Sequence, residues 1–199
     1  MPKRQEINKR AMLVGFQPVE DEQRSDRLIL RGTPIVYDTK TMLYEWDGVK
    51  YYEIIERGAL DGADVSDVVF YFEHHGRVYA RSRNGSLKLT NADDSASVEI
   101  ELDPNDQGHR ELYNDIKAGR VDRMSFCFSI EEESFNNETN TFTVKKIRKL
   151  FDVSAVAFAA YDQTDIEARD SFREEQARQL AERAANQRRQ TAIAYSLTF

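Results

Sequence analysis

The sequence predicts a mainly β fold with some α-helix, of the α+β class, built on a small closed or nearly closed β-barrel with surface helices. Ten short apolar runs with turn residues between them indicate ten strands, whereas only two stretches have helical spacing. A length of 199 residues suits one compact domain and a tail. Hydrophobic residues make up 40% of the chain, which is enough for a core.

Charge and apolar pattern divide the chain into three parts. Residues 1–26 are polar and highly charged, and we expect a flexible leader that could add one edge strand. Residues 27–169 contain the apolar runs and form the predicted domain. Residues 170–199 predict a helical tail, because Ser171 and Glu174 have capping-box spacing and no Gly or Pro follows. Its apolar stripe is thin, so this helix either packs on a partner or projects into solvent.

The predicted strands are rich in Val, Ile, Phe and Tyr, and several alternate apolar with polar residues. They cover residues 27–32, 34–38, 50–55, 68–72, 77–81, 86–89, 97–102, 124–130, 141–147 and 150–158. A surface helix is predicted over 106–119, where Leu112, Ile116 and Ala118 share one face and Gly119 is a natural stop.

Composition excludes several classes of protein. The 28 Lys and Arg against 35 Asp and Glu leave a net charge of −7, which argues against a dedicated nucleic-acid binder. No apolar run reaches the roughly 18 residues of a membrane span, and the N-terminus lacks a secretory signal, so we expect no membrane partner and a cytoplasm-like location. Cys127 is the only cysteine, which excludes an internal disulfide and any multi-cysteine zinc site. We expect no cofactor.

Histidine chemistry has three candidates, His74, His75 and His109. The first two follow an apolar strand, and on an extended backbone their side chains would point to opposite faces and could not share a metal ion. A hydrogen bond to backbone at the strand end is the simplest interpretation of either one. A metal-dependent hydrolase using His74 and His109 is disfavoured, because no histidine pair has helix-type ligand spacing.

The strand at 124–130 has an unusual polar face. Alternation puts its four large apolar side chains on one face, and Ser125, Cys127 and Ser129 on the other. A serine is a poor nucleophile unless a neighbouring base takes its proton, so Ser125 needs a histidine within reach. Cys127 has the same facing and is a rival nucleophile. Both residues could also be ordinary small side chains of a packed strand.

Asp152 is a single charge at the head of an apolar strand, and such an acid usually has a specific partner. It could orient a histidine, as the acid of a catalytic triad does. It could equally pair with Arg148 or Lys149 nearby.

Five segments, in their order and spacing over residues 27–169, resemble the prohead (capsid maturation) proteases of tailed phages. These proteases are related in fold to the herpesvirus assembly protease, assemblin. The segments are LRGTPIVYD, YYEIIERGAL, VVFYFEHHGRVYARSRNGSLKL, DIKAGRVDRMSFCFSI and DVSAVAFAAYDQTDIEAR. The resemblance implies an assemblin-like barrel and a prohead protease domain over 27–169.

The resemblance also implies site residues. The family's Asn-His-Asp-like motif falls on residues 73–75, which makes His74 the general base. Its Ser-Phe-Gly-Phe motif falls on 125–128, which makes Ser125 the nucleophile. The acid before its Val-Ser-x-Val strand falls on Asp152, the third member; in the herpesvirus relatives this member is a histidine.

This sequence departs from the family pattern in three places. Glu73 and His75 replace the usual flanks, so His75 stays open as an alternative base. Cys127 replaces a glycine, and its bulkier side chain would narrow the site. Residues 159–161, Ala-Ala-Tyr, replace Pro-Ala-Tyr, which would loosen that turn.

The function implied by the resemblance is a serine endopeptidase of procapsid maturation. Its substrates would be the scaffolding protein, or a scaffold-like segment of the major capsid protein, and the protease itself. It would act in the host cytoplasm, inside the assembling procapsid, and a homo-oligomer is left open. The alternative is a non-enzymatic capsid-assembly or scaffold-associated domain with the same barrel, in which Ser125 and His74 lie too far apart to share a proton.

Overall fold

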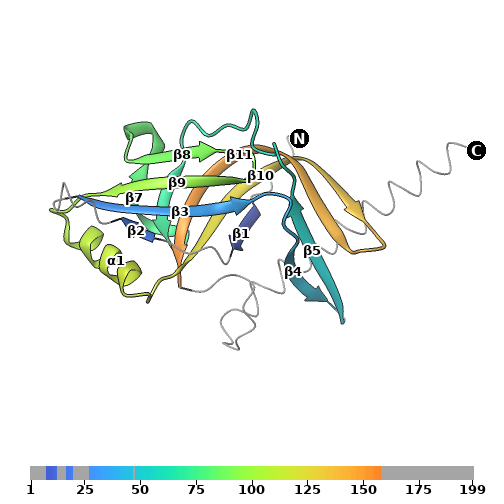
Figure 1. Cartoon of the computed structure of the whole chain (residues 1–199), viewed down its shortest axis with the longest axis horizontal. Helices are drawn as coiled ribbons and strands as arrows, with labels where there is room; N and C mark the ends of the chain where they lie inside the picture. Colours follow the sequence, from blue (N-terminus) through green and yellow to red (C-terminus); the bar gives the residue numbers. More distant parts are fainter. Residues whose placement is uncertain (1–7, 13–16, 20–26, 47, 158–199) are drawn as a thin grey trace, which may run out of the picture.

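The computed structural model describes residues 8–12, 17–19, 27–46 and 48–157, which form two β-sheets and one α-helix (Figure 1). The helix, α1 (Gln107–Lys117), connects β9 to β10, and a short 3₁₀ turn, η1 (Ser82–Asn84), connects β7 to β8. The strands are β1 (Asn8–Met12), β2 (Gln17–Val19), β3 (Leu28–Val36), β4 (Thr41–Trp46), β5 (Val49–Ile55), β6 (Val69–Phe72), β7 (His75–Arg81), β8 (Leu87–Asn91), β9 (Ser95–Leu102), β10 (Arg123–Asn136) and β11 (Thr141–Val156).

All ten predicted strand segments overlap strands of the structure, but two pairs of them fuse. The runs at 27–32 and 34–38 belong to one strand, β3, whose register against β9 shifts between Gly32 and Ile35. Pro34 lies inside this irregularity, because proline has no N–H to donate to a regular ladder. The runs at 141–147 and 150–158 likewise join in β11. β4 was not predicted, and two short strands, β1 and β2, lie within residues 1–26.

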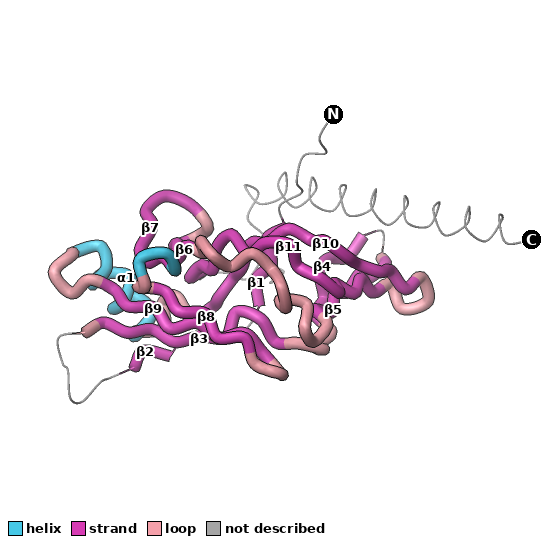
Figure 2. The backbone as a smooth tube through the Cα atoms, turned by 90° about the horizontal axis from the view of Figure 1, so that it is seen from above, coloured by secondary structure: helices cyan, strands magenta, loops and turns pink. Residues whose placement is uncertain are grey.

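Seven strands make the larger sheet, which we call sheet A, and four make sheet B. Sheet A runs in the order β1-β10-β11-β5-β4, with β6 also paired to β11 and β7 paired to β6. Long β11 contacts β5 along its first half and β6 along its second, both in parallel. Sheet B has the order β2-β3-β9-β8 and is antiparallel throughout. Figure 2 shows the strands of sheet B running side by side next to β10 and β11.

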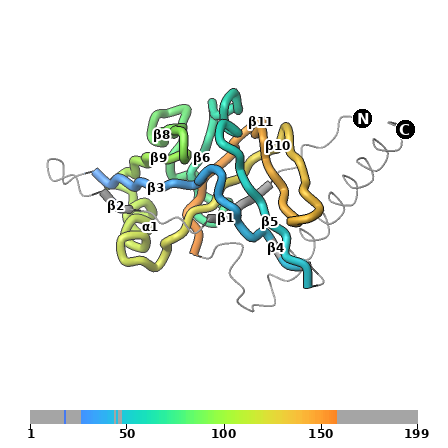
Figure 3. Tube along the Cα trace, turned by 45° about the vertical axis from the view of Figure 1, so that its right-hand side comes forward, coloured from blue at the N-terminus to red at the C-terminus, as the bar shows by residue number. Residues whose placement is uncertain are grey.

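The expectation of a closed or nearly closed barrel is wrong. In the described residues the backbone ladders form two separate sheets, each with its own edge strands. Strands β4 and β5 and the turn between β10 and β11 lie at the end of the molecule opposite α1, away from most of sheet B (Figure 3). Alternating apolar residues show only that one face of a strand is buried, and two packed sheets bury it as well as a barrel does. Closure depends on pairing between distant edge strands, which no local pattern encodes.

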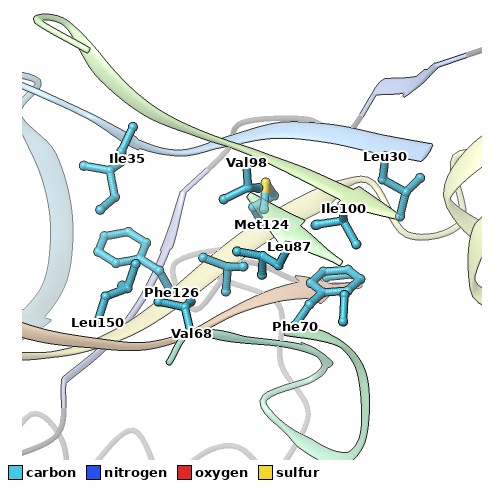
Figure 4. Packing of buried hydrophobic residues seen from close by; sticks show 14 of the residues in the cluster. Leu30, Ile35, Val68, Phe70, Leu87, Val98, Ile100, Met124, Phe126 and Leu150 are labelled. Atoms are coloured by element: carbon cyan, nitrogen blue, oxygen red, sulfur yellow. The ribbon is translucent and has the colours of Figure 1, made fainter. Parts of the chain in front are cut away.

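The main core fills the space between the two sheets (Figure 4). Ile35, Val98 and Ile100 of sheet B face Phe70 and Phe126 of sheet A, and all five are at most 2% exposed. β9 alternates strictly between buried and partly buried residues, as the sequence predicts for a half-buried strand. A smaller apolar cluster lies further along sheet A and consists of Leu43, Tyr51 and Phe142, with Phe135 packed against it.

β10 departs from the pattern of a half-buried strand. Residues 124–129 are all buried, so the polar face with Ser125 and Cys127 is covered as well as the apolar face. Its neighbours on the two sides are β1 and β11. The candidate nucleophile therefore lies in a strand buried on both faces.

Helix α1 forms where it is predicted. Asp106 caps it by accepting a hydrogen bond from the backbone N–H of His109 at 3.1 Å, and Gly119 follows its end with a left-handed φ of 69°. Its buried residues include Leu112 and Ile116. Ala118, however, is exposed, because the helix has already ended there and the residue is the C-cap. The predicted tail helix over 170–199 and the turn at 159–161 lie outside the described residues.

Candidate active site

His74 lies in the two-residue turn that connects β6 to β7. Phe72 and His75 are opposite each other in this hairpin, which leaves Glu73 and His74 as the turn residues. Both have a positive φ, 55° and 60°, as a type I′ turn requires. The backbone at His74 is therefore not extended, so the opposite-face argument, which holds for an extended strand, does not describe the two histidines. Asn and Gly are the usual residues of such turns, so Glu and His need support from outside the hairpin.

That support comes from the end of β11. The backbone N–H of Glu73 donates to the carbonyl oxygen of Ala155 at 2.9 Å. The Glu73 carboxylate oxygen Oε1 accepts a hydrogen bond from the backbone N–H of Ala157 at 2.8 Å. These two bonds tie the turn to β11 and hold His74 in its left-handed conformation. Such strain is often found where a side chain must be presented for a function.

Ser125 and Asp152 come from the adjacent strands β10 and β11. In this antiparallel ladder Ser125 is opposite Ser154, and Cys127 is opposite Asp152. Side chains directly opposite each other share a face of the sheet, so Ser125 and Asp152 project to the same side. β6 pairs with the other edge of β11, where Asp152 is opposite Val69, and it leads into the turn with His74. Three neighbouring strands, β10, β11 and β6, thus bring Ser125, Asp152 and His74 close together.

The three predicted site residues form one chain of hydrogen bonds. His74 Nε2 is 2.5 Å from Ser125 Oγ, and His74 Nδ1 is 2.6 Å from Asp152 Oδ1. The residue Ser125 is 2% exposed, and the side chains of His74 and Asp152 are 10% and 8% exposed. With the imidazole proton on Nδ1, that nitrogen donates to the carboxylate and Nε2 accepts from the serine hydroxyl. This is the arrangement in which a histidine can take the serine proton.

The rival assignments have other surroundings. His75 is exposed, and its Nδ1 is 3.4 Å from the carbonyl oxygen of Phe72, outside ordinary hydrogen-bond distance. His109 is buried in α1, where its Nδ1 accepts the backbone N–H of Asp103 at 3.0 Å. Burial lowers the pKa of His109, which favours the neutral ring that such acceptance requires. The two ring nitrogens of His74 are within hydrogen-bond distance of Ser125 and Asp152. The buried Cys127 is opposite Asp152 in the ladder of β10 and β11, two residues after Ser125.

The sequence left open whether Asp152 contacts a histidine or a basic residue nearby, and in the structure it contacts a histidine. Its carboxylate contacts His74, whereas the nearby Lys149 ammonium pairs with Asp64 at 2.8 Å. Arg148 is exposed. The lysine and Ser66 together lower the pKa of Asp64 well below its usual range.

The sequence model of the caudovirus prohead serine protease family matches residues 16–179. The chain belongs to this family of prohead serine proteases. The match extends beyond both bounds of the predicted domain and includes all three of the hydrogen-bonded residues Ser125, His74 and Asp152. Neither a curated protein nor a solved structure gives a significant match, so the relation in fold to assemblin stays a prediction.

The sequence analysis did not identify Ser154, a polar residue that contacts the candidate site of this prohead protease family member. Ser154 is fully buried beside the three residues, and its Oγ donates to Asp152 Oδ1 at 2.8 Å. The available signal was its position two residues after Asp152, which puts both side chains on one face of a strand.

Within the described ranges, no group of three or more His, Cys, Asp or Glu side chains is arranged to hold a metal ion. The same part of the chain contains no helix with the length and apolarity of a membrane span.

Proposed function

We propose that this chain is a serine endopeptidase of procapsid maturation, with Ser125 as nucleophile, His74 as general base and Asp152 as the acid that orients the imidazole. The observation that carries the proposal is the continuous hydrogen-bonded chain from Ser125 Oγ through both nitrogens of His74 to Asp152 Oδ1. Its three members come from three different elements, and membership in a family of serine proteases supports their roles.

The proposed chemistry proceeds in two acyl-transfer steps. Ser125 Oγ attacks the carbonyl carbon of the scissile peptide bond while His74 Nε2 takes the hydroxyl proton. The imidazolium then gives this proton to the leaving amine, and an acyl ester remains on the serine. The neutral imidazole then takes a proton from a water molecule, whose oxygen attacks the acyl carbon. The imidazolium gives this proton to Ser125 Oγ as the ester bond breaks and the acid product leaves. Asp152 accepts from Nδ1–H throughout, which keeps Nε2 free for the proton and stabilises the imidazolium.

The proposed substrates are scaffolding protein, or scaffold-like segments of the major capsid protein, and the chain itself. The family acts on proheads by its description, which supports capsid and scaffold proteins as substrates and the assembling shell in the host cytoplasm as the location. Residues 170–199 would attach the enzyme inside the shell and be trimmed by self-cleavage.

The inactive alternative has no observation in its favour. It predicts a distance between Ser125 and His74 that is too long for a shared proton, whereas the two atoms are 2.5 Å apart.

The test is incubation of the purified chain, alone and with the scaffolding and major capsid proteins, followed by mass measurement. We expect cleavage that increases with time, and its loss by a factor of about 10⁴ to 10⁶ in Ser125→Ala and His74→Ala. Cys127→Ala and His75→Ala are the matched controls and should retain cleavage. Activity in Ser125→Ala together with loss in Cys127→Ala would show that the nucleophile is misassigned. The corresponding result for the two histidines would move the base to His75, and inhibition by a chelator would favour a metal-dependent hydrolase.

A further inference from the structure

Ser154 has the environment of a fourth member of the site. It is fully buried, its Oγ donates to Asp152 Oδ1 at 2.8 Å, and the same Oγ lies 3.2 Å from His74 Nδ1. In the ladder of β10 and β11 it is directly opposite Ser125. Its hydroxyl therefore meets the acid and the base, and its Cα is paired with that of the nucleophile.

The hydrogen bond from Ser154 gives the Asp152 carboxylate a second fixed donor. Oδ1 accepts from His74 Nδ1 and from Ser154 Oγ, and two donors restrict rotation of the carboxylate about its Cβ–Cγ bond. The group is nearly buried, where a carboxylate charge needs hydrogen bonds to be stable. The orientation of the carboxylate in turn determines how the imidazole presents Nε2 to the serine.

We propose that Ser154 is a positioning residue that holds Asp152, and through it His74, in the geometry for proton transfer. This inference rests on the proposed function, because it assigns Ser154 a part in activating Ser125. The same strand geometry explains why the role falls on this residue. Asp152 and Ser154 are two residues apart on β11, so their side chains lie next to each other on one face.

Burial of a serine in these strands does not by itself require a partner. Ser129 of β10 is 2% exposed, and its hydroxyl has no hydrogen-bond partner among the described residues. It is a matched control, since Ser129→Ala removes a buried hydroxyl from the same pair of strands without touching the site.

The experiment measures how fast a fluorophosphonate probe labels Ser125, because this reaction needs an activated serine but no knowledge of the cleavage sequence. We expect Ser154→Ala to lower the maximal labelling rate by about 10- to 100-fold, the effect of losing one hydrogen bond to a charged group. The probe concentration at half-maximal rate should not change, because Ser154 does not contact the probe. Ser129→Ala should label like the wild type.

Conservative variants separate positioning from packing. Ser154→Thr keeps the hydroxyl and should recover most of the rate, whereas Ser154→Cys, a weak donor, should stay slow. Thermal unfolding identifies any variant that fails to fold, and Ser154→Ala, which only removes an atom, remains informative if threonine does not fit.

Failure of the role proposed for Ser154 and failure of the proposed function would give different results. If Ser154→Ala labels within twofold of the wild type while Ser125→Ala does not label, the role of Ser154 is wrong and the proposed function stands. If the wild type neither labels nor cleaves, the proposed function is wrong and the inference about Ser154 is overturned with it.

Discussion

Gly32 lies in β3 where this strand packs against β10, and its lack of a side chain leaves room for Met124. A methyl group added there by Gly32→Ala would lie 2.2 Å from Met124 Sδ and 3.4 Å from its Cε. Atoms of this size normally approach to about 3.5–4.0 Å, so the thioether would have to move by more than an ångström. Met124 is fully buried, and because protein cores are close-packed, its thioether can move only by displacing neighbouring side chains. We therefore expect a loss of about 1–3 kcal/mol in the free energy of unfolding.

The measurement is equilibrium unfolding in urea, with Gly108→Ala as the control. Gly108 is in α1, and its added methyl would meet the guanidinium of Arg77, which is half exposed and can move away. Alanine also favours the helix over glycine by up to about 1 kcal/mol, so this variant should be unchanged or stabilised. In a Met124→Ala background the cost of Gly32→Ala should shrink, because the clashing sulfur is gone. A cost below about 0.5 kcal/mol for Gly32→Ala alone would refute the steric reasoning.

Three other outcomes are expected. Glu73→Ala removes the acceptor that ties the His74 turn to Ala157, so labelling of the active serine should slow about 5- to 10-fold. Glu73→Gln keeps an acceptor and should be labelled at close to the wild-type rate. Equal labelling rates for the two variants would contradict this role of Glu73. Phe70→Ala empties a fully buried site between the sheets and should cost about 3–5 kcal/mol in urea unfolding, with a loss under 1 kcal/mol contradicting its place in the core. Burial, and to a smaller extent a nearby aspartate, raises the pKa of Tyr37 to about 12. The neutral phenol therefore stabilises the folded state fully below about pH 10, and this stabilisation is lost as the pH rises to about 12. Ultraviolet titration should show a late tyrosine transition that is absent in Tyr37→Phe.

Much of the secondary structure was predictable because it depends on neighbours in the chain. The alternation in 97–102 predicts the half-buried strand β9, and the spacing of Leu112 and Ile116 before Gly119 predicts α1. The family resemblance rests on motifs of the same local kind, and the family match confirms it. The roles of the three site residues stay predictions, although the sequence and the resemblance together select them.

The arrangement of the sheets and of the site was not predictable, because both depend on residues far apart in the chain. His74 and Ser125 are 51 positions apart, and His74 and Asp152 are 78 apart, so their contacts exist only after β6, β10 and β11 have paired. Glycine or asparagine would have indicated the left-handed turn in the sequence, but its two residues are Glu73 and His74. Hydrogen bonds to the end of β11 stabilise this turn, and they cannot be read from the local sequence. Composition and local pattern thus determined which strands and which reactive side chains this protein has. Long-range strand pairing alone decided that two sheets form instead of a barrel, and that a serine, a histidine and an aspartate meet.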